Sequence, residues 1–278
     1  MSELFKNLSE QEKQEITNTV DSYEPKARSY DEYVFKFDSI FETRDGSKMM
    51  ILQGSDRWLE LRHKHFNAST VSRIMYKETT YKTGDKKGQA RIEGIEPFNA
   101  MCYVKAQGQE LDLLPESQQF ANADFGHLNE TKAIDYILKV NNLDRNDFII
   151  NLFDIDDETK LMASPDMMHR SGKYGFEIKC PKYDSGNHMR VINNVKDGES
   201  LKEYNKDYYW QVMANMYVFG AKHWYFCSYA EYMNDAFKLH VVRIDRNEED
   251  ISTLVDRLIS AKNTVKSFYS VTTNSLIY

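Results

Sequence analysis

The stretch SPDMMHRSGKYGFEIKCP, residues 164–181, restricts the fold more than any other part of the chain. Side chains alternate between the two faces of a strand, so Glu177 and Lys179 share one face and their apolar neighbours point to the other. The SGKYG turn folds the preceding strand back alongside, which predicts that Asp166 lies next to Glu177. Charged groups in such an apolar hairpin require compensating partners.

A metal ion is one partner that would compensate the charges of this hairpin. Two carboxylates a few ångströms apart repel each other strongly unless a cation lies between them. Oxygen ligands with a lysine alongside favour Mg²⁺ or Mn²⁺ over zinc. The alternative is a surface hairpin whose glutamate and lysine form a pair on the solvated face.

The segments around this hairpin have the periodicities of an α/β domain. Helical spacing of apolar residues comes first, then three short strand-like runs, a helix, two more strands and a final helix. This order predicts a mixed central sheet flanked by helices. The predicted helices span residues 56–66, 95–107, 118–140, 206–219 and 247–268, and the residues NAST (67–70) would cap one more. The predicted strands span residues 148–155, 160–166, 174–180, 223–229 and 237–244.

Composition excludes several classes of protein. With 278 residues and 41% hydrophobic residues, the chain can form a sizeable core. It lacks an apolar run of the roughly 20 residues that a bilayer requires, and its polar N-terminus lacks a signal-peptide core, so we expect a cytoplasmic protein. Three scattered cysteines do not support a disulfide framework or a cysteine-rich metal site. We expect residues 1–45 to be an appendage, partly helical over 8–21, and residues 46–278 to be a single domain.

The pattern S-P-D…E-I-K-C-P resembles the PD-(D/E)xK nuclease signature, and specifically that of the lambda-exonuclease (YqaJ-type viral recombinase) family. Three further segments are similar to that family in the same order, so the resemblance covers about residues 53–245. It implies a restriction-endonuclease-like core with a mixed central β-sheet flanked by helices. The segments are QGSDRWLELRHKHFNAST (53–70), FGHLNETKAIDYI (125–137) and YYWQVMANMYVFGAKHWYFCSY (208–229).

The resemblance implies a catalytic role for each charged residue of the hairpin. Asp166 and Glu177, with the backbone carbonyl of Ile178, would bind Mg²⁺ or Mn²⁺, as two ions per site. Lys179 would position or deprotonate the attacking water.

Two residues from other segments would complete this centre. The resemblance implies that Glu130 faces the metal as a ligand or through a water, whereas by position alone it could be a solvated charge in the first turn of a helix. Gln211 would orient the water or the lysine. Its alternative role is that of a buried structural amide that caps nearby backbone.

A second group of residues would recognise the DNA end. By resemblance, Arg62, Ser69 and Ser164 hold the 5′-terminal phosphate. Taken alone, Arg62 could be an arginine whose aliphatic part covers core surface, and Ser69 could be a plain helix cap. The basic segment 77–91 would follow the DNA backbone or form a solvated loop; its candidate residues are Lys82, Lys86, Lys87 and Arg91. The acidic segment DIDDE (154–158) is expected to be a solvated turn.

Together these features predict a Mg²⁺-dependent exonuclease that degrades linear double-stranded DNA from the 5′ end. It would release 5′-mononucleotides and leave a 3′ single strand for phage-type recombination. The resemblance further implies a ring-shaped homotrimer and a single-strand annealing protein as partner. The alternatives are another nuclease of the same fold, such as an endonuclease or a CRISPR-associated type, or a DNA-binding module without catalysis.

Overall fold

The computed structural model describes residues 53–109 and 123–272 together with four short strands near the N-terminus. These strands form two pairs, β1 with β2 and β3 with β4. The helix expected over residues 8–21 and most of the expected appendage lie outside the described residues, so the appendage stays a prediction. The strands are β1 (Ala27–Arg28), β2 (Tyr33–Val34), β3 (Ile40–Glu42) and β4 (Lys48–Met50).

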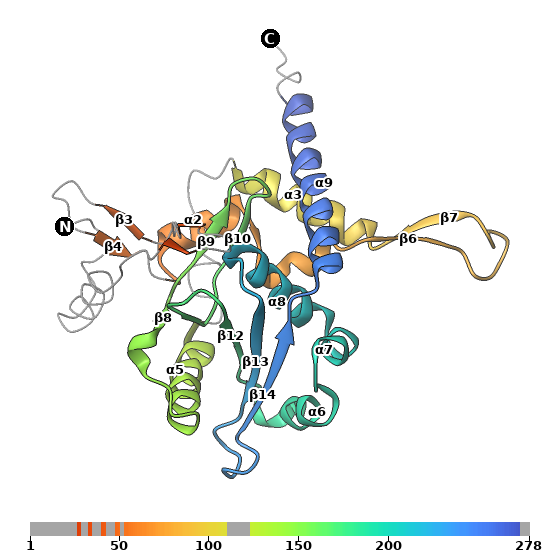
Figure 1. Cartoon of the computed structure of the whole chain (residues 1–278). Coiled ribbons are helices and arrows are strands. Elements are labelled where there is room, and N and C mark those ends of the chain that lie inside the picture. Colours follow the sequence, from red (N-terminus) through yellow and green to blue (C-terminus); the bar gives the residue numbers. More distant parts are fainter. Residues whose placement is uncertain are drawn as a thin grey trace.

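A five-stranded sheet in the order β14-β13-β12-β11-β8 forms the centre of the fold (Figure 1). Strands β12 and β13 run parallel, and the other neighbours are antiparallel. The predicted mixed sheet is therefore confirmed. Its strands are β8 (Phe148–Ile150), β11 (Met167–His169), β12 (Gly175–Lys179), β13 (His223–Tyr229) and β14 (Leu239–Asp245).

A smaller sheet in the order β5-β10-β9 lies beside the central one, and it corrects two predicted strands. The run 148–155 was expected to be one strand but divides between the two sheets. Asn151, with φ of 61°, turns the chain between β8 and β9 in the left-handed region that asparagine tolerates. The run 160–166 was also expected to be one strand, but β10 ends at Ala163 and the next strand, β11, begins only at Met167. The strands of the smaller sheet are β5 (Phe66–Asn67), β9 (Asp154–Asp156) and β10 (Leu161–Ala163).

Helices cover both faces of the central sheet. Apolar residues of α5, such as Ile134 and Ile137, pack on the face that carries Phe176 and Ile178. The other face packs against α8, whose polar side chains contact Glu177 and its neighbour Lys179. The helices are α2 (Asp56–Lys64), α3 (Ile95–Gln109), α5 (Ala123–Val140), α6 (Asn187–Asn194), α7 (Gly198–Tyr204), α8 (Lys206–Phe219) and α9 (Glu248–Thr272).

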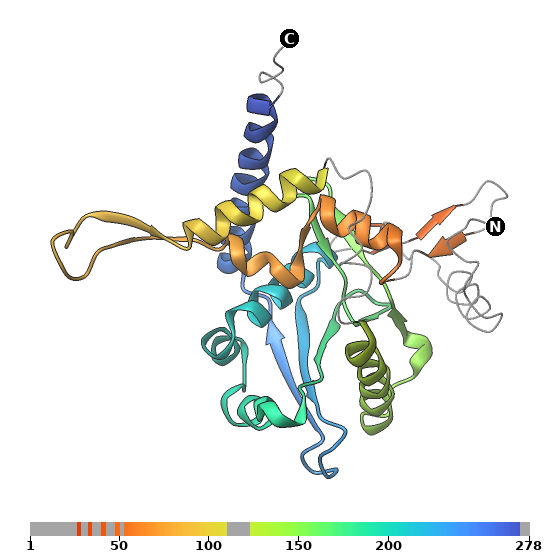
Figure 2. The same cartoon turned by 180° about the vertical axis from the view of Figure 1, so that it is seen from behind.

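Several segments differ from the expected elements. The basic segment 77–91 is not a plain loop: it forms a hairpin of β6 (Lys77–Thr80) and β7 (Ala90–Glu93) that extends away from the body (Figures 1 and 2). Helices α6 and α7 are short and were not predicted. Three 3₁₀ helices complete the described chain, namely η2 (Ala68–Ile74), η3 (Arg145–Asp147) and η4 (Tyr183–Ser185). None of the helices in the described residues is both long and apolar enough to span a membrane.

Candidate active site

The β11–β12 hairpin brings Asp166 and Glu177 together, as its sequence predicts. Met167 pairs with Phe176 in an antiparallel register, so the residue before Met167 lies across from the residue after Phe176. One oxygen of Asp166, Oδ2, accepts a hydrogen bond of 2.5 Å from the backbone N–H of Ile178. The two carboxylates therefore meet at the end of this hairpin.

A buried polar network connects the other face of β12 with helix α8. Lys179 Nζ donates to Glu177 Oε1 at 2.6 Å and to Gln211 Oε1 at 3.1 Å, and it lies 5.1 Å from the ring centre of Tyr208. Asn215 Nδ2 donates to the second oxygen, Glu177 Oε2, at 3.0 Å. Because Glu177 is only 1% exposed, the alternative of a Glu–Lys pair on a solvated face is wrong.

Gln211 occupies the position expected of it, one turn before Asn215 on the same face of α8. Its side chain contacts the lysine itself and does not cap nearby backbone in the contacts that the structure shows. Asn215 was not predicted as a site residue, although its spacing of four residues from Gln211 places it on that face. The buried oxygen Asn215 Oδ1 lacks a hydrogen-bond partner in the described part of the chain, and it lies on the amide that holds Glu177.

Burial and like charges disfavour a negative charge on Asp166. Its pKa is raised well above the usual value, first by burial and then by repulsion from Glu177 and Glu130. The balance at Lys179 is opposite. Burial alone would lower its pKa, but Glu177 and Asp166 outweigh that effect and raise the pKa.

The donor set at this hairpin fits a hard divalent cation. Asp166 and Glu177 supply carboxylate oxygens, and a positive charge between them would relieve the repulsion that raises the pKa of Asp166. Among the residues whose side chains the structure describes, no cluster of three or more His, Cys, Asp and Glu side chains is arranged to hold a metal. Glu130 is not part of such a cluster, but it lies close enough to raise the pKa of Asp166. Burial, and then the charge of Glu130, also raises the pKa of Cys180 to about 12.

A cationic pocket lies on α2 and η2. The guanidinium of Arg62 lies 4.5 Å from the ring centre of Trp58 and donates to Ser69 Oγ at 3.1 Å. The indole Nε1 of Trp58 in turn donates to Ser164 Oγ at 3.2 Å. The three residues expected to hold a phosphate are therefore joined through one tryptophan. We call Trp58, Arg62, Ser69 and Ser164 the cationic pocket.

Another cation, the buried Lys105, contacts the backbone of Arg62. Lys105 on α3 is 5% exposed, and its Nζ donates to the backbone carbonyl of Arg62 at 2.7 Å. Burial, and then repulsion by Arg62, lowers the pKa of Lys105 to about 7. In the described residues neither cation has a carboxylate within ion-pair distance. Lys105 was missed because its helix, IEPFNAMCYVKAQGQ, places it among apolar residues without any motif around it.

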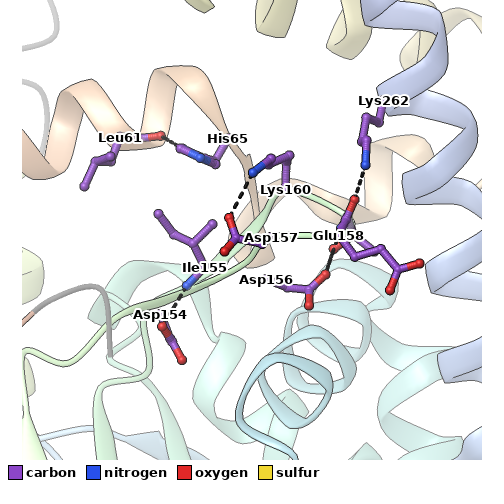
Figure 3. A network of polar contacts seen from close by, with 10 residues as sticks. Leu61, His65, Asp154, Ile155, Asp156, Asp157, Glu158, Lys160 and Lys262 are labelled. Atoms are coloured by element: carbon purple, nitrogen blue, oxygen red, sulfur yellow. Dashed lines mark hydrogen bonds and ion pairs between the residues drawn. The ribbon is translucent and has the colours of Figure 1, made fainter. Parts of the chain in front are cut away.

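Two local expectations are corrected. Ser69 is not a helix cap, because Asn67 is the N-cap of η2 and Ser69 lies inside its first turn with its hydroxyl toward Arg62. The segment 154–158 is a solvated turn only at Asp157 and Glu158, which are exposed, whereas its first three residues form strand β9. Asp156 is in strand β9 and accepts from Thr159, and the carbonyl of Glu158 accepts from Lys262 of α9 (Figure 3).

The remaining contacts of Figure 3 are local to this side of the smaller sheet. Lys160 pairs with Asp157, and a ring nitrogen of His65 contacts the carbonyl of Leu61 at the end of α2. This acidic segment therefore has a structural role, since the hydrogen bond from Lys262 to Glu158 joins the turn after β9 to helix α9.

Comparisons with known proteins identify a family and a shared fold. Residues 57–222 match the YqaJ-like viral recombinase domain family, which is more than half of the chain. The fold is similar to that of an alkaline exonuclease from Laribacter hongkongensis (TM-score 0.56, 18% identity, covering 78% of this chain and 96% of that one).

Two further solved structures share the fold. The complex of the Laribacter exonuclease with dAMP gives a TM-score of 0.54 at 18% identity, over 78% of this chain and 95% of that one. A phage-related exonuclease from Haemophilus somnus 129PT gives 0.54 at 16% identity, over 76% and 98% of the two chains. No curated protein matches the chain in sequence.

Proposed function

Because the chain belongs to the YqaJ-like viral recombinase domain family, we propose that it is a metal-dependent exonuclease that degrades linear double-stranded DNA from the 5′ end. The observation that carries this proposal is the short connection between its two sites. Ser164 of the cationic pocket and Asp166 of the carboxylate pair are two residues apart, at most about 7 Å along the backbone. A terminal phosphate beside Ser164 and a reacting phosphate beside Asp166 then belong to neighbouring nucleotides.

Each residue of the catalytic network has a separate role. Asp166, Glu177 and the carbonyl of Ile178 would hold Mg²⁺ or Mn²⁺, with Glu130 contributing negative charge nearby. A pair of such ions supplies stabilisation of the charges that develop on the attacking and leaving oxygens. Lys179 positions the attacking water by donating a hydrogen bond, and Gln211 fixes the direction of the lysine.

The cationic pocket would select the end to be cut. Arg62 offers a planar guanidinium that suits a terminal phosphate, because that group carries more negative charge than a phosphodiester. Ser69 and Ser164 add hydroxyl donors. Binding at this pocket sets the direction of cleavage as 5′ to 3′ and releases 5′-mononucleotides, which is consistent with the dAMP complex of the Laribacter exonuclease.

The wider assignment follows from the family. The remaining 3′ single strand would enter phage-type recombination with a single-strand annealing protein, in the cytoplasm of a bacterial host. A ring-shaped homotrimer would keep the enzyme on its DNA. An endonuclease or CRISPR-associated nuclease of the same fold is the alternative, and a DNA-binding module without catalysis is disfavoured because Asp166, Glu177 and Lys179 are all present and in contact with one another or with α8.

One experiment tests the proposal directly. The protein is incubated with Mg²⁺ and linear duplexes that carry 5′-phosphate or 5′-hydroxyl ends, beside a covalently closed circle and a sample with EDTA. We expect release of mononucleotides from the 5′-phosphate duplex, little from the hydroxyl duplex, and no activity with EDTA. Cutting of the closed circle would overturn the exonuclease assignment. A preference for 3′ ends would overturn the assignment of the cationic pocket.

A further inference from the structure

The β6–β7 hairpin protrudes from the body of the described chain (Figures 1 and 2). It leaves the body between η2, which carries Ser69, and α3, which carries Lys105, and both views show it extending away from the sheets (Figures 1 and 2). Its strands pair from Lys77–Glu93 to Thr80–Ala90. The pairing continues past β6, because the backbone N–H of Tyr81 donates to the carbonyl of Gln89 and the N–H of Gly88 donates to the carbonyl of Tyr81. The hairpin is therefore an ordered arm with a short tip.

The charge of this arm is opposite to that of the whole protein. The chain has a net charge of −7, whereas residues 77–93 carry five basic and three acidic side chains. The excess is concentrated at the tip, where every residue from 82 to 91 is exposed. The basic residues are Lys77, Lys82, Lys86, Lys87 and Arg91, and the acidic ones are Glu78, Asp85 and Glu93.

Tyr81 organises the cations at the tip. Lys86 Nζ lies 5.7 Å and Arg91 Cζ 5.5 Å from the centre of its ring. Cation–π contacts of this kind fix the side chains while N–H groups can still face an acceptor. Arg91 also pairs with Glu93 at 3.3 Å. Gly84 and Gly88, with φ of 75° and 87°, adopt the left-handed backbone that the turn at the tip requires. The arm thus presents oriented donors on a narrow support.

The composition of the arm favours a polyanion over a protein as its partner. The centre of a protein–protein interface is rich in apolar and aromatic residues and poor in lysine. On this arm the one large exposed apolar side chain in the described residues is Ile92, and lysine is the commonest residue. Clustered lysines on an otherwise acidic protein are typical of a nucleic-acid contact.

We propose that the β6–β7 hairpin is a DNA arm that contacts the phosphate backbone of the duplex beyond the end that is being cut. This inference rests on the proposed function, because it assumes a duplex in the site. From Lys77 to the tip the arm is about eight residues long, which corresponds to about 25 Å in extended strands. That reach equals about seven base pairs of B-DNA. Binding by the arm adds affinity without reading sequence, since phosphates carry no base identity.

The test compares two triple variants of the full chain. One variant replaces the exposed tip lysines, K82Q/K86Q/K87Q. The matched control replaces three exposed lysines far from the hairpin in sequence, K139Q/K173Q/K266Q, and has the same net charge. Equilibrium binding to a 5′-phosphorylated duplex is measured in EDTA over a range of salt concentrations. Cleavage kinetics in Mg²⁺ and the molar mass by light scattering are measured on the same samples.

We expect the hairpin variant to bind duplex roughly tenfold or more weakly at moderate salt. Its slope of log affinity against log salt should be shallower by roughly 2 to 3, because three phosphate contacts are lost. KM should rise with kcat unchanged, and the control should behave as the wild type. Equal salt slopes in the two variants would overturn the DNA arm. A change in molar mass of the hairpin variant alone would also overturn it, in favour of a contact between copies of the chain.

The same measurements separate this inference from the proposed function. If the wild type binds duplex with the hairpin-dependent slope but never cleaves it, the exonuclease assignment fails and the arm stands. If the wild type cleaves from 5′ ends and both variants bind equally well, the exonuclease stands and the arm fails.

Discussion

The two halves of the candidate site treat charge in opposite ways. Both carboxylate oxygens of Glu177 already have partners, since Lys179 donates to one and Asn215 donates to the other. In the cationic pocket Arg62 contacts an aromatic ring and a hydroxyl, and the buried Lys105 behind it donates to a carbonyl. In the described residues neither of these two cations is neutralised by a carboxylate.

This difference indicates what each half is built to receive. A buried carboxylate pair with a raised pKa at Asp166 gains from a cation. The half-buried Arg62 and the buried Lys105, which lack a counter-charge in the described residues, gain from an anion, since burial of an unpaired charge is unfavourable. A nucleotide chain and its metal ions supply both, so substrate binding would complete both halves.

The largest effect should come from breaking the paired half. Lys179→Ala removes the group that we propose to position the water and leaves Glu177 with one partner fewer. We expect kcat on a 5′-phosphorylated duplex to fall roughly 10²–10⁴-fold, while affinity for the DNA end changes little. The control is Lys173→Ala, an exposed lysine on the turn of the same hairpin. Undiminished turnover in Lys179→Ala would refute the proposed role of the network.

The next effect should come from the unpaired half. Arg62→Gln removes the charge that we propose to bind the terminal phosphate but retains a polar side chain. We expect activity on 5′-phosphate ends to fall roughly 10–100-fold, because a hydrogen bond to a charged group contributes about 1.5–3 kcal/mol. Activity on 5′-hydroxyl ends should stay the same, which is measured by initial rates on matched duplexes. Arg73→Gln, exposed on the same 3₁₀ helix, is the control and should retain the phosphate preference.

Stability against pH tests whether the second cation is truly unpaired. The pKa of Lys105 is lowered to about 7, so between pH 7 and 10 the unfolded chain binds more protons than the folded chain. The free energy of unfolding should therefore rise with pH in this range, by up to about 1.4 kcal/mol per pH unit.

Urea unfolding at pH 7, 8 and 9 measures this slope. Lys105→Met should abolish the part of the slope that belongs to this lysine. The charged neighbours are Arg62, which stays protonated, and His63, whose own pKa is lowered by burial and titrates below this range. A slope that is the same in the wild type and in Lys105→Met would show that the lysine is neutralised by a partner.

The smallest effect should come from the link between the halves. Trp58→Phe keeps an aromatic ring beneath Arg62 but removes the indole N–H that donates to Ser164. Loss of one neutral hydrogen bond corresponds to about 1 kcal/mol, so we expect the preference for 5′-phosphate ends to fall about fivefold. A loss as large as that of Arg62→Gln would mean that the indole contacts the phosphate itself.

Local patterns predicted part of the paired half of the site. Alternation along residues 174–180 placed Glu177 and Lys179 on one face, and helical spacing placed Gln211 and Asn215 on one face of α8. These relations involve neighbouring residues or regular elements, so the sequence carries them directly. The contact of Gln211 with Lys179 was expected only from the family resemblance.

The support of the cationic pocket could not be predicted in the same way. Lys105 reaches the carbonyl of Arg62 across a separation of 43 residues, and its position depends on how α3 packs against α2. The break between β8 and β9 likewise depends on one asparagine, Asn151, in the left-handed region. Long-range packing and single turn residues leave little periodic signal, so their consequences became visible only in the fold.

The way the β6–β7 hairpin joins the body has a consequence for how this protein can vary. Its first and last residues, Lys77 and Glu93, are paired neighbours, so the arm starts and ends at almost the same point of the body. Lengthening or shortening such an excursion changes the closure entropy only slowly with its length. The arm can therefore be remodelled by insertion or deletion while η2 and α3 stay in place. The proposed grip on the duplex and the proposed chemistry at the cut end are in this sense separately adjustable.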